Sequence, residues 1–208
     1  MNLVIVDTQL SNVKSLTEAV TLLSDANVSI SNDPEKLVKA DKVILPGVGA
    51  FSRCMDRLSK SYCSDALGEI ASKGVPILGI CLGMQILGTE SSEFGRHPGL
   101  NLIPGSIDAL SNNPKLKKNF KKTHIGWSSV QITNTNYITA ELVTDDYFYF
   151  VHSYYFSPFD ASDILAAIKI NDALVPAIVG RNNVFGCQFH PEKSGKSGLS
   201  FLNKFLSL

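Results

Sequence analysis

The sequence has no excess of charge of either sign. Its 208 residues contain 19 lysines and arginines and 19 aspartates and glutamates, so the formal net charge is zero. Nucleic acids and acidic membranes attract proteins through extended basic surfaces, so we expect neither as a partner. A solvated loop or helix face explains the one basic run better than a binding patch does; the run contains Lys115, Lys117, Lys118, Lys121 and Lys122.

Long apolar runs and paired cysteines are also missing. No apolar segment has the roughly 20 residues that cross a bilayer, and the N-terminus lacks the basic start and apolar stretch of a secretory signal. The four cysteines show neither the spacing of a metal site nor an evident disulfide framework. We therefore expect a cytoplasmic protein that uses Cys54, Cys63 and Cys187 for packing.

Cys187 and His190 resemble half of a metal site. Strand alternation would separate their side chains, because successive residues of a strand point to opposite faces. The sequence therefore predicts no metal, and nothing in it calls for another cofactor.

Strand and helix signals alternate through the first half of the chain. A helix expected over residues 12–23 carries an apolar stripe, and Asp33 followed by Pro34 is typical of a helix start. This rhythm predicts a parallel sheet with helices on both faces. Strands are expected at 3–7, 28–30, 42–45 and 75–80, and further helices after residues 33 and 51 and over 64–73.

The second half is richer in strand signals, and a hairpin turn is expected at residues 181–183. With 44% hydrophobic residues and no linker or repeat, the chain predicts one three-layer α/β domain over residues 1–208, with a mixed, mostly parallel central sheet. The expected strands are 106–110, 122–130, 147–156, 164–170, 177–181 and 184–189, followed by a helix over 197–206.

The most informative stretch is Gly79-Ile80-Cys81-Leu82-Gly83, which lies between a predicted buried strand and an apolar helical pattern. A glycine two residues either side of Cys81 permits the sharp turn that presents a nucleophile at the edge of a sheet. The first N–H groups of the helix would favour a thiolate there. A cysteine in such a setting can also be a plain core residue.

A nucleophile needs a base, and the base needs a group that orients it. His190 and Glu192 follow the predicted strand 184–189, with Pro191 stiffening the link. Alternate residues at a strand end can face the same side, so we expect an imidazole–carboxylate relay that reaches Cys81. Alone, this pair of residues could be an accident of the surface; together with Cys81 it predicts a catalytic triad.

Other polar groups are expected near the same edge. The loop Gly47, Val48 and Gly49 follows a predicted strand, and its N–H groups, with that of Leu82, could hold an oxyanion; the alternative is a plain glycine-rich turn. One helical turn after Cys81, Gln85 can face the same pocket. Four further residues could contact a substrate or could be ordinary polar surface, and the local sequence does not decide between the two. They are Glu93, His152, Ser153 and Tyr154.

These motifs resemble the triad-type (class I) glutamine amidotransferases, a family with a flavodoxin-like fold. More narrowly they are similar to the amidotransferase subunits of imidazole glycerol phosphate synthase in histidine biosynthesis. The matches run in family order through the chain: Pro46–Gly49, Gly79–Gln85, Gly99–Gly105, His124-x-Gly126-Trp127, Tyr149–Tyr154 and Gln188–Ser194.

The resemblance implies that Cys81 attacks the side-chain amide of glutamine, with His190 and Glu192 managing the protons. A glutamyl thioester forms, ammonia leaves, and water releases glutamate. It also implies a heterodimer with a (β/α)₈-barrel cyclase, which receives the ammonia. Because the peptides of the glycine-rich loop can take more than one orientation, we expect the isolated chain to be nearly idle. By resemblance, Gly47–Gly49 and Leu82 form the oxyanion region; Gln85, Glu93, His152, Ser153 and Tyr154 form the glutamine pocket; Asn12, Trp127 and Lys193 face the cyclase.

Two segments depart from the family pattern. After the first strand the chain has Thr8–Asn12 in place of a Tyr-Gly-x-Gly-Asn run, and Thr123–Ser128 stands for Pro-His-Met-Gly-Trp-Asn. A paralogue that supplies ammonia for amidino-sugar synthesis is therefore an alternative. A catalytically silent binding module and a cysteine hydrolase of peptides are further alternatives, and the triad and Gln85 speak against them.

Overall fold

An eight-stranded central sheet organises the computed structural model, which describes residues 1–10, 13–116, 122–142 and 146–208. The strand order is β2-β1-β3-β4-β14-β13-β12-β9. Strands from β2 to β14 are parallel, and the last three pairings are antiparallel. The mixed, mostly parallel sheet is therefore confirmed. The strand bounds are β1 Asn2–Val6, β2 Asn27–Ser31, β3 Lys42–Gly47, β4 Ile77–Cys81, β9 Gln131–Ile132, β12 Ile164–Ile170, β13 Ala173–Arg181 and β14 Val184–Cys187.

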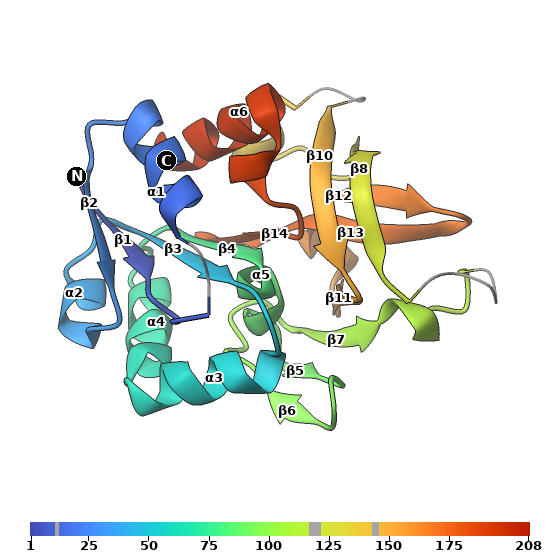
Figure 1. The fold of residues 1–208 in the computed structure, drawn as a ribbon, viewed down its shortest axis with the longest axis horizontal. Coiled ribbons are helices and arrows are strands. Elements are labelled where there is room, and N and C mark those ends of the chain that lie inside the picture. The colour runs from blue at the N-terminus through green and yellow to red at the C-terminus, as the bar shows by residue number, and fades with distance from the viewer. Residues whose placement is uncertain (11–12, 117–121, 143–145) are drawn as a thin grey trace.

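Helices cover both faces of this sheet, as expected (Figure 1). Alternate residues of β1 enter two different cores: Leu3 and Ile5 pack on one side, and Val4 and Val6 on the other. Because both faces are buried, β1 is a continuous apolar run. Helices α1 (Lys14–Leu23) and α6 (Gly195–Leu206) close the first core; α2 (Pro34–Val38), α3 (Phe51–Lys60), α4 (Cys63–Ser72) and α5 (Leu82–Ile86) close the second.

The expectation of one strand over residues 147–156 was wrong. The chain bends at Ser153 between β10 (Tyr147–His152) and β11 (Tyr154–Pro158), which belong to different sheets. The bend is required because β10 pairs with β8 (His124–Ser129), whereas β11 pairs with β7 (Gly105–Ala109). The second of these sheets continues to β5 (Glu90–Ser91) and β6 (His97–Pro98), two short strands that the sequence analysis did not predict.

Local signals elsewhere were read correctly. The side chain of Asp33 accepts a hydrogen bond from the backbone N–H of Glu35 and caps α2. Arg181 pairs with Val184 across the β13–β14 hairpin, and Asn182 takes a positive φ of 54° in its turn. Of the basic run, Lys117, Lys118 and Lys121 lie outside the described residues.

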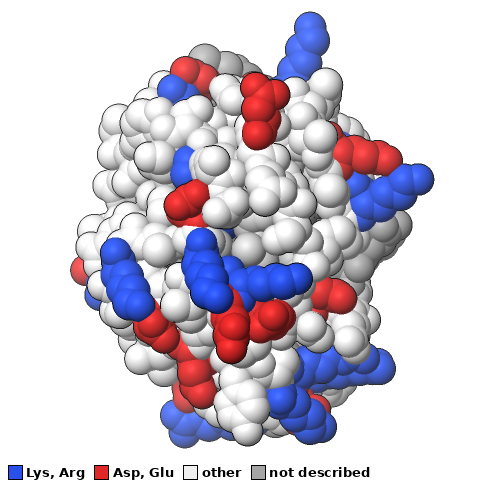
Figure 2. Space-filling view, turned by 90° about the vertical axis from the view of Figure 1, so that its left-hand side faces the viewer, with Lys and Arg blue, Asp and Glu red and all other residues white. Residues whose placement is uncertain are grey.

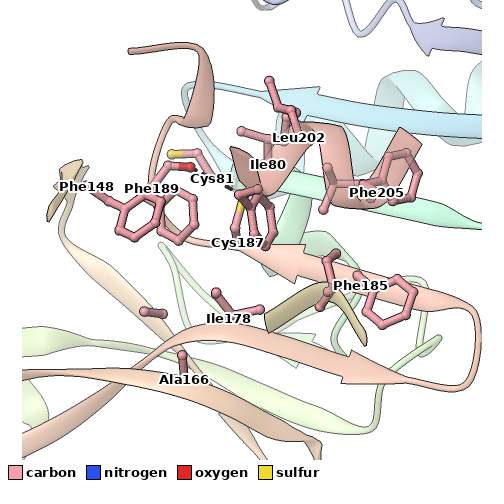
Figure 3. Close-up of a cluster of buried hydrophobic side chains, with 14 of the residues drawn as sticks. Ile80, Cys81, Phe148, Ala166, Ile178, Phe185, Cys187, Phe189, Leu202 and Phe205 are labelled. Atoms are coloured by element: carbon pink, nitrogen blue, oxygen red, sulfur yellow. Dashed lines mark hydrogen bonds between the residues drawn. The ribbon is translucent and has the colours of Figure 1, made fainter. Parts of the chain in front are cut away.

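Aromatic packing joins β10, the end of β14 and α6 beneath the predicted nucleophile. The rings of Phe148 and Phe189 stack with centroids 4.1 Å apart, and Phe201 of α6 meets Phe189 edge-on at 5.2 Å. Figure 3 shows Cys81 at the border of this cluster, with Cys187 inside it. The large buried rings give the carboxyl edge of the sheet a rigid support.

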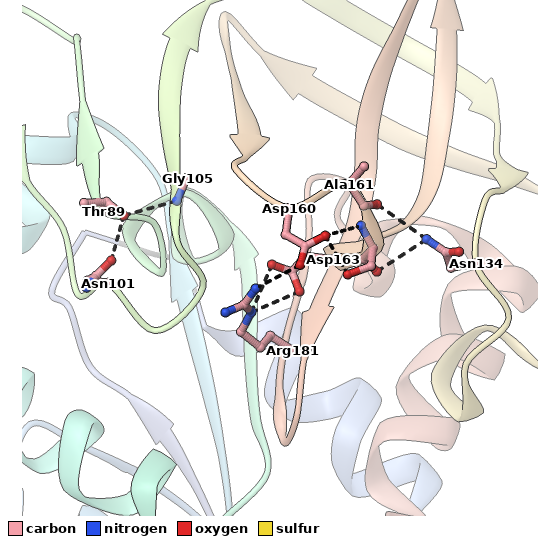
Figure 4. Close-up of polar contacts among 9 residues, drawn as sticks. Thr89, Asn101, Gly105, Asn134, Asp160, Ala161, Asp163 and Arg181 are labelled. Carbon is pink, nitrogen blue, oxygen red and sulfur yellow. Dashed lines mark hydrogen bonds and ion pairs between the residues drawn. The ribbon is translucent and has the colours of Figure 1, made fainter.

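Polar contacts fix the antiparallel end of the molecule (Figure 4). The Nε atom of Arg181 donates to both carboxylate oxygens of the buried Asp163, at 3.1 and 3.0 Å. On the neighbouring loop, Thr89 contacts Asn101 at 2.6 Å and accepts from the N–H of Gly105 at 3.1 Å. These contacts hold loops against strand ends, away from the predicted nucleophile.

Charges of both signs mix on the face that carries the N-terminal helices (Figure 2). Within single helices the structure forms i,i+4 ion pairs, such as Lys39 with Glu35 and Lys60 with Asp56. Such exposed pairs add little stability, and their mixture leaves no single-sign surface on this face. Within the ranges described, no helix combines the length and hydropathy that crossing a bilayer demands.

A buried lysine ties the end of α6 to the sheet. Lys42 begins β3 and is only 7% exposed, and its Nζ atom donates to the backbone carbonyls of Phe205 and Leu206. These carbonyls lie in the last turn of the helix, where they lack partners inside the helix. Burial lowers the pKa of Lys42, while the charge of Asp41 opposes that shift.

We predict that Lys42→Met lowers the free energy of unfolding by about 2 kcal/mol, because it removes the side-chain donor to the buried carbonyl of Leu206 at the helix end. Urea denaturation would measure the loss. The control is Lys169→Met at an exposed position of β12, for which a change within about 0.5 kcal/mol is expected. Equal stability of the two variants would contradict the role of Lys42.

Candidate active site

Cys81 lies on a strained turn between β4 and α5. It has φ 56° and ψ −110°, a backbone conformation that residues with a side chain rarely adopt. Close packing demands the two glycines. A Cβ atom on Gly83 would lie 1.7 Å from the carbonyl oxygen of Leu45, and one on Gly79 would lie 2.5 Å from that of Gly83. The strand–turn–helix arrangement is the one predicted from the sequence.

His190 and Glu192 form the expected relay, but not by strand alternation. Strand β14 ends at Cys187, and His190 caps a 3₁₀ turn over Pro191–Lys193 that contains Glu192. This turn brings the carboxylate back to the ring, with Nδ1 of His190 2.9 Å from Oε1 of Glu192. Because the carboxylate accepts, Nδ1 carries the proton.

The contacts of His190 favour its charged form. Burial lowers the pKa of His190, but hydrogen bonds with Cys81 and Glu192, and the charges of those two groups, outweigh burial and raise the pKa to about 9. An imidazolium beside the sulfur is the partner that a thiolate needs. The geometry can therefore support nucleophilic attack by Cys81.

A third polar group reaches the sulfur. The side-chain Nε2 of Gln188 lies 3.7 Å from Sγ of Cys81, and Gln188 is completely buried. The amide of Gln85 donates in turn to Oε1 of Gln188 at 3.0 Å. Sequence reasoning gave Gln188 no role, because a glutamine after a buried strand carries no local signal beyond its position two residues before His190.

A cavity of about 490 Å³ opens over Cys81. It brings together nearly all residues that were expected in the oxyanion region and the substrate pocket. Phe94, Thr123 and Val151 also line it, and the sequence analysis had predicted no site role for them. The predicted residues in its wall are Val48, Gly49, Cys81, Leu82, Gln85, Glu93, His152, Ser153, Tyr154 and His190.

Two expected residues lie on a second cavity, of about 280 Å³, behind the same loop. Gly47 and Lys193 line it, together with Glu192. It shares Val48 and His190 with the first cavity. Val48 of the glycine-rich loop and His190 therefore lie between the two hollows.

Glu93 and His152 are held in defined states. Oε2 of Glu93 accepts from the backbone N–H of Phe51 at 2.5 Å, which fixes the carboxylate at the start of α3. Nδ1 of His152 donates to the carbonyl of Tyr154 at 2.8 Å. Burial lowers the pKa of His152 to about 4, so the ring is neutral at neutral pH.

The residues expected to face a partner have different outcomes. Asn12 lies outside the described residues. Trp127 is 55% exposed on β8, with its ring 5.9 Å from that of Tyr149, and Lys193 is exposed beside the second cavity. Among residues whose placement is described, no cluster of histidine, cysteine and acidic side chains could hold a metal ion.

Comparison with known proteins identifies the family. The family model "Glutamine amidotransferase class-I" matches residues 4–207. This chain belongs to the class-I glutamine amidotransferases. The amidotransferase is 41% identical over 204 residues, 98% of its length and 97% of the other, to the protein of Lactococcus lactis subsp. lactis (strain IL1403) named imidazole glycerol phosphate synthase subunit HisH.

A second named relative and a solved structure are also similar to this chain. A Salinibacter ruber (strain DSM 13855 / M31) protein of the same name is 35% identical over 205 residues, covering 98% of the amidotransferase and 93% of the relative. The solved structure of PurLQS from Thermotoga maritima superimposes with a TM-score of 0.74 at 19% identity, covering 99% and 97% of the two chains. At that identity the likeness concerns the fold, and it confirms the predicted fold class.

The raised pKa of His190 makes the stability of the amidotransferase depend on pH. A group whose folded pKa of about 9 exceeds its ordinary 6.5 contributes stability that is fully present below pH 6.5 and is lost as pH rises through 9. We predict that the free energy of unfolding falls more steeply over this window in the wild type than in His190→Gln. Glu192→Gln should show an intermediate slope, and parallel curves for all three proteins would contradict the assignment.

Proposed function

We propose that this chain hydrolyses glutamine at Cys81 and passes the ammonia to a (β/α)₈-barrel cyclase subunit, with which it forms a heterodimer. Its class-I family and its full-length relatives named imidazole glycerol phosphate synthase subunit HisH support its assignment as the glutaminase subunit of that synthase, in histidine biosynthesis. The observation that carries the residue assignment is the sulfur of Cys81 beside the charged, carboxylate-bound His190 at the floor of the cavity.

In the proposed reaction the thiolate of Cys81 attacks the amide carbon of glutamine. A sulfur–carbon bond forms, and the carbon–nitrogen bond breaks as His190 gives its proton to the leaving ammonia. Water, deprotonated by His190, then attacks the thioester carbon, and the electron pair of the sulfur–carbon bond returns to sulfur as glutamate leaves. Glu192 holds the imidazole in the orientation that both steps need.

The negative oxygen of each tetrahedral intermediate needs donors. The backbone N–H of Leu82 follows the nucleophile, and Val48 and Gly49 face it across the cavity. Gly49 has a positive φ of 96°. Glycine adopts such angles readily and other residues do not, so the peptides of this loop can take more than one orientation. If the partner must aim the second donor, the chain alone loses about 10²–10³ in rate.

Glutamine fits the remaining cavity wall. The carboxylate of Glu93 suits the α-ammonium group of the substrate, and Gln85 and the backbone of His152–Tyr154 offer polar contacts along its length. We assign these residues to substrate binding, with no cofactor. We also treat residues 1–208 as a single domain in the cytoplasm.

The outer face of the β8–β10 pair suits the cyclase. Its outward-pointing residues are apolar or aromatic except Ser129, whereas Phe148 and Phe150 on the inner face are buried. Such a patch is typical of an obligate interface. We call it the ribbon face, and it consists of Ile125, Trp127, Tyr147, Tyr149 and Val151.

This face is connected to the catalytic residues. The carbonyl of Tyr149 accepts from the backbone N–H of His190 at 3.0 Å, and the N–H of Tyr149 donates to the side chain of Ser194 at 3.0 Å. Exposed Lys193 lies between these two residues of the catalytic loop. A partner on the ribbon face would therefore lie one strand away from the base.

The alternatives have less support. The relatives described above carry the name of imidazole glycerol phosphate synthase and not of a sugar pathway. A silent binding module would not require a charged histidine beside a strained cysteine. A peptide hydrolase would not need the carboxylate that is fixed in the wall of this cavity, whereas the α-ammonium group of glutamine suits it.

We predict that Cys81→Ala lowers glutamine turnover by at least about 10⁴-fold and leaves ammonia-dependent cyclisation by the complex intact. Glutamate release is measured with the chain alone and with a histidine-pathway cyclase and its ribotide ligand, and the wild type should rise strongly only with both. Cys54→Ala, a buried cysteine of α3, is the control and should keep glutamine turnover. Turnover retained by Cys81→Ala would refute the mechanism.

We predict that Trp127→Ala weakens binding to the cyclase about 30-fold, because a tryptophan at the centre of an interface contributes roughly 2 kcal/mol or more. Titration calorimetry would measure the affinity. Phe159→Ala removes an aromatic ring that is more exposed, at 68%, but lies off the ribbon face, so it should bind like the wild type. Equal affinities for all three proteins would place the partner elsewhere.

A further inference from the structure

The carbonyl oxygen of Tyr154 fixes a chain of hydrogen bonds that ends at the nucleophile. It accepts from Nδ1 of His152 at 2.8 Å and from Nε2 of Gln85 at 3.3 Å. A backbone carbonyl can only accept. It therefore fixes the amide of Gln85 with its NH₂ group toward Tyr154.

The orientation passes to the next amide. The same Nε2 of Gln85 donates to Gln188 at 3.0 Å, so the oxygen of Gln188 must face Gln85. The NH₂ group of Gln188 is then left facing Cys81, with Nε2 3.7 Å from Sγ. The carbonyl of Tyr154, in the cavity wall, thus determines through Gln85 that Gln188 presents a donor to the sulfur.

Burial makes this relay rigid and dry. Gln188 is 0% exposed, so water does not compete for its amide, and Gln85 is only 7% exposed in the cavity wall. The backbone of Gln188 is also fixed, because its N–H donates to the carbonyl of Ala177 in β13 at 2.9 Å. A buried side-chain amide is costly unless its hydrogen bonds are made, and the sulfur is the acceptor that the structure gives to this NH₂ group.

We propose that Gln188 is a catalytic residue that donates a permanent hydrogen bond to the Cys81 sulfur, and that Gln85 is the positioning residue that orients it. The proposal deepens the glutaminase mechanism given above and rests on it. Hydrogen bonds to the charged form of a group favour that form. Gln188 thereby stabilises the thiolate both before attack and when sulfur leaves the thioester carbon.

The two donors at the sulfur have different tasks. His190 releases its proton to ammonia and takes another from water, so its bond to sulfur changes within each cycle. The amide of Gln188 has no proton to give and remains a donor throughout. When the sulfur–carbon bond breaks, the electron pair returns to a sulfur that already has a fixed N–H beside it.

Alkylation of Cys81 by iodoacetamide measures the thiolate directly. The other cysteines do not interfere, because burial raises the pKa of Cys54 to about 12 and raises those of Cys63 and Cys187. Mass spectrometry of the Cys81 peptide gives the rate at each pH. The profile is a property of the Cys81–His190 pair.

We expect Gln188→Met to move the midpoint of this profile up by about one pH unit, so that alkylation near neutral pH is about 10-fold slower, while the limiting rate at high pH changes less than about 2-fold. In the complex with the cyclase, kcat for glutamine should fall about 10-fold with KM nearly unchanged. Gln85→Met should move the midpoint in the same direction by about half as much, because Gln188 then keeps its donor but loses its orientation.

Asn183→Met is the matched control, because it removes an amide that donates to the carbonyls of Ala71 and Val75, which precede β4, whereas the nucleophile lies at the other end of that strand. This variant should leave the alkylation profile unchanged even if it lowers the free energy of unfolding. Gln188→Leu is made alongside Gln188→Met, and if neither folds, the shift in Gln85→Met decides. A wild-type alkylation profile in a folded Gln188 variant overturns the proposal. If neither Gln188 variant folds, a wild-type profile in Gln85→Met overturns it.

The readouts separate this proposal from the mechanism on which it rests. If the wild type alkylates at Cys81 with the expected dependence on Gln188 but does not turn over glutamine with the cyclase, the proposed function fails and the donor role stands. If glutamine turnover is normal and the profile ignores Gln188, only the donor role fails.

Discussion

The close approach of α5 to β3 is the constraint on which the site depends. Gly83 lies so near the carbonyl of Leu45 that no side chain fits between them, and this contact forces the turn that strains Cys81. A looser turn would let Cys81 relax into the sheet, away from His190 and the amide of Gln188. The strain at one residue is held by packing on both faces of the sheet, where β3 and β4 are completely buried.

Around this fixed turn, the neighbouring groups decide the charge of each buried histidine. His190 and His152 both lie in the wall of the cavity and are almost equally hidden, yet their pKa values move in opposite directions. His190 has a sulfur and a carboxylate as neighbours, whereas His152 has a carbonyl and a second histidine. One ring is therefore ready to donate a proton, and the other is a neutral part of the wall.

Much of this arrangement follows from the sequence because local signals and the sheet agree. The elbow at Cys81, the cap at Asp33 and the turn at Asn182 each depend on residues within a few positions of one another. The break at Ser153 does not, because it reflects which sheets β10 and β11 join. The route from His190 to Glu192 was misjudged for a related reason: β14 ends at Cys187, so a tight turn replaces the strand.

Gln188 shows the limit of motif reasoning most clearly. Its role depends on the orientation of an amide set through Gln85 by a carbonyl at Tyr154, residues separated by much of the chain. A sequence presents glutamines in both places and says nothing about which end of each amide points where. Only the hydrogen bonds of the folded structure determine the orientation of the two amides.

The ribbon face has a consequence for the life of the chain before assembly. Two strands alone make a marginal sheet, and β8 and β10 persist because their inner face packs on the aromatic core around Phe189. Their outer face has no such cover in the single chain. A newly made chain therefore exposes an apolar surface that favours self-association, and a partner bound to the ribbon face would cover it.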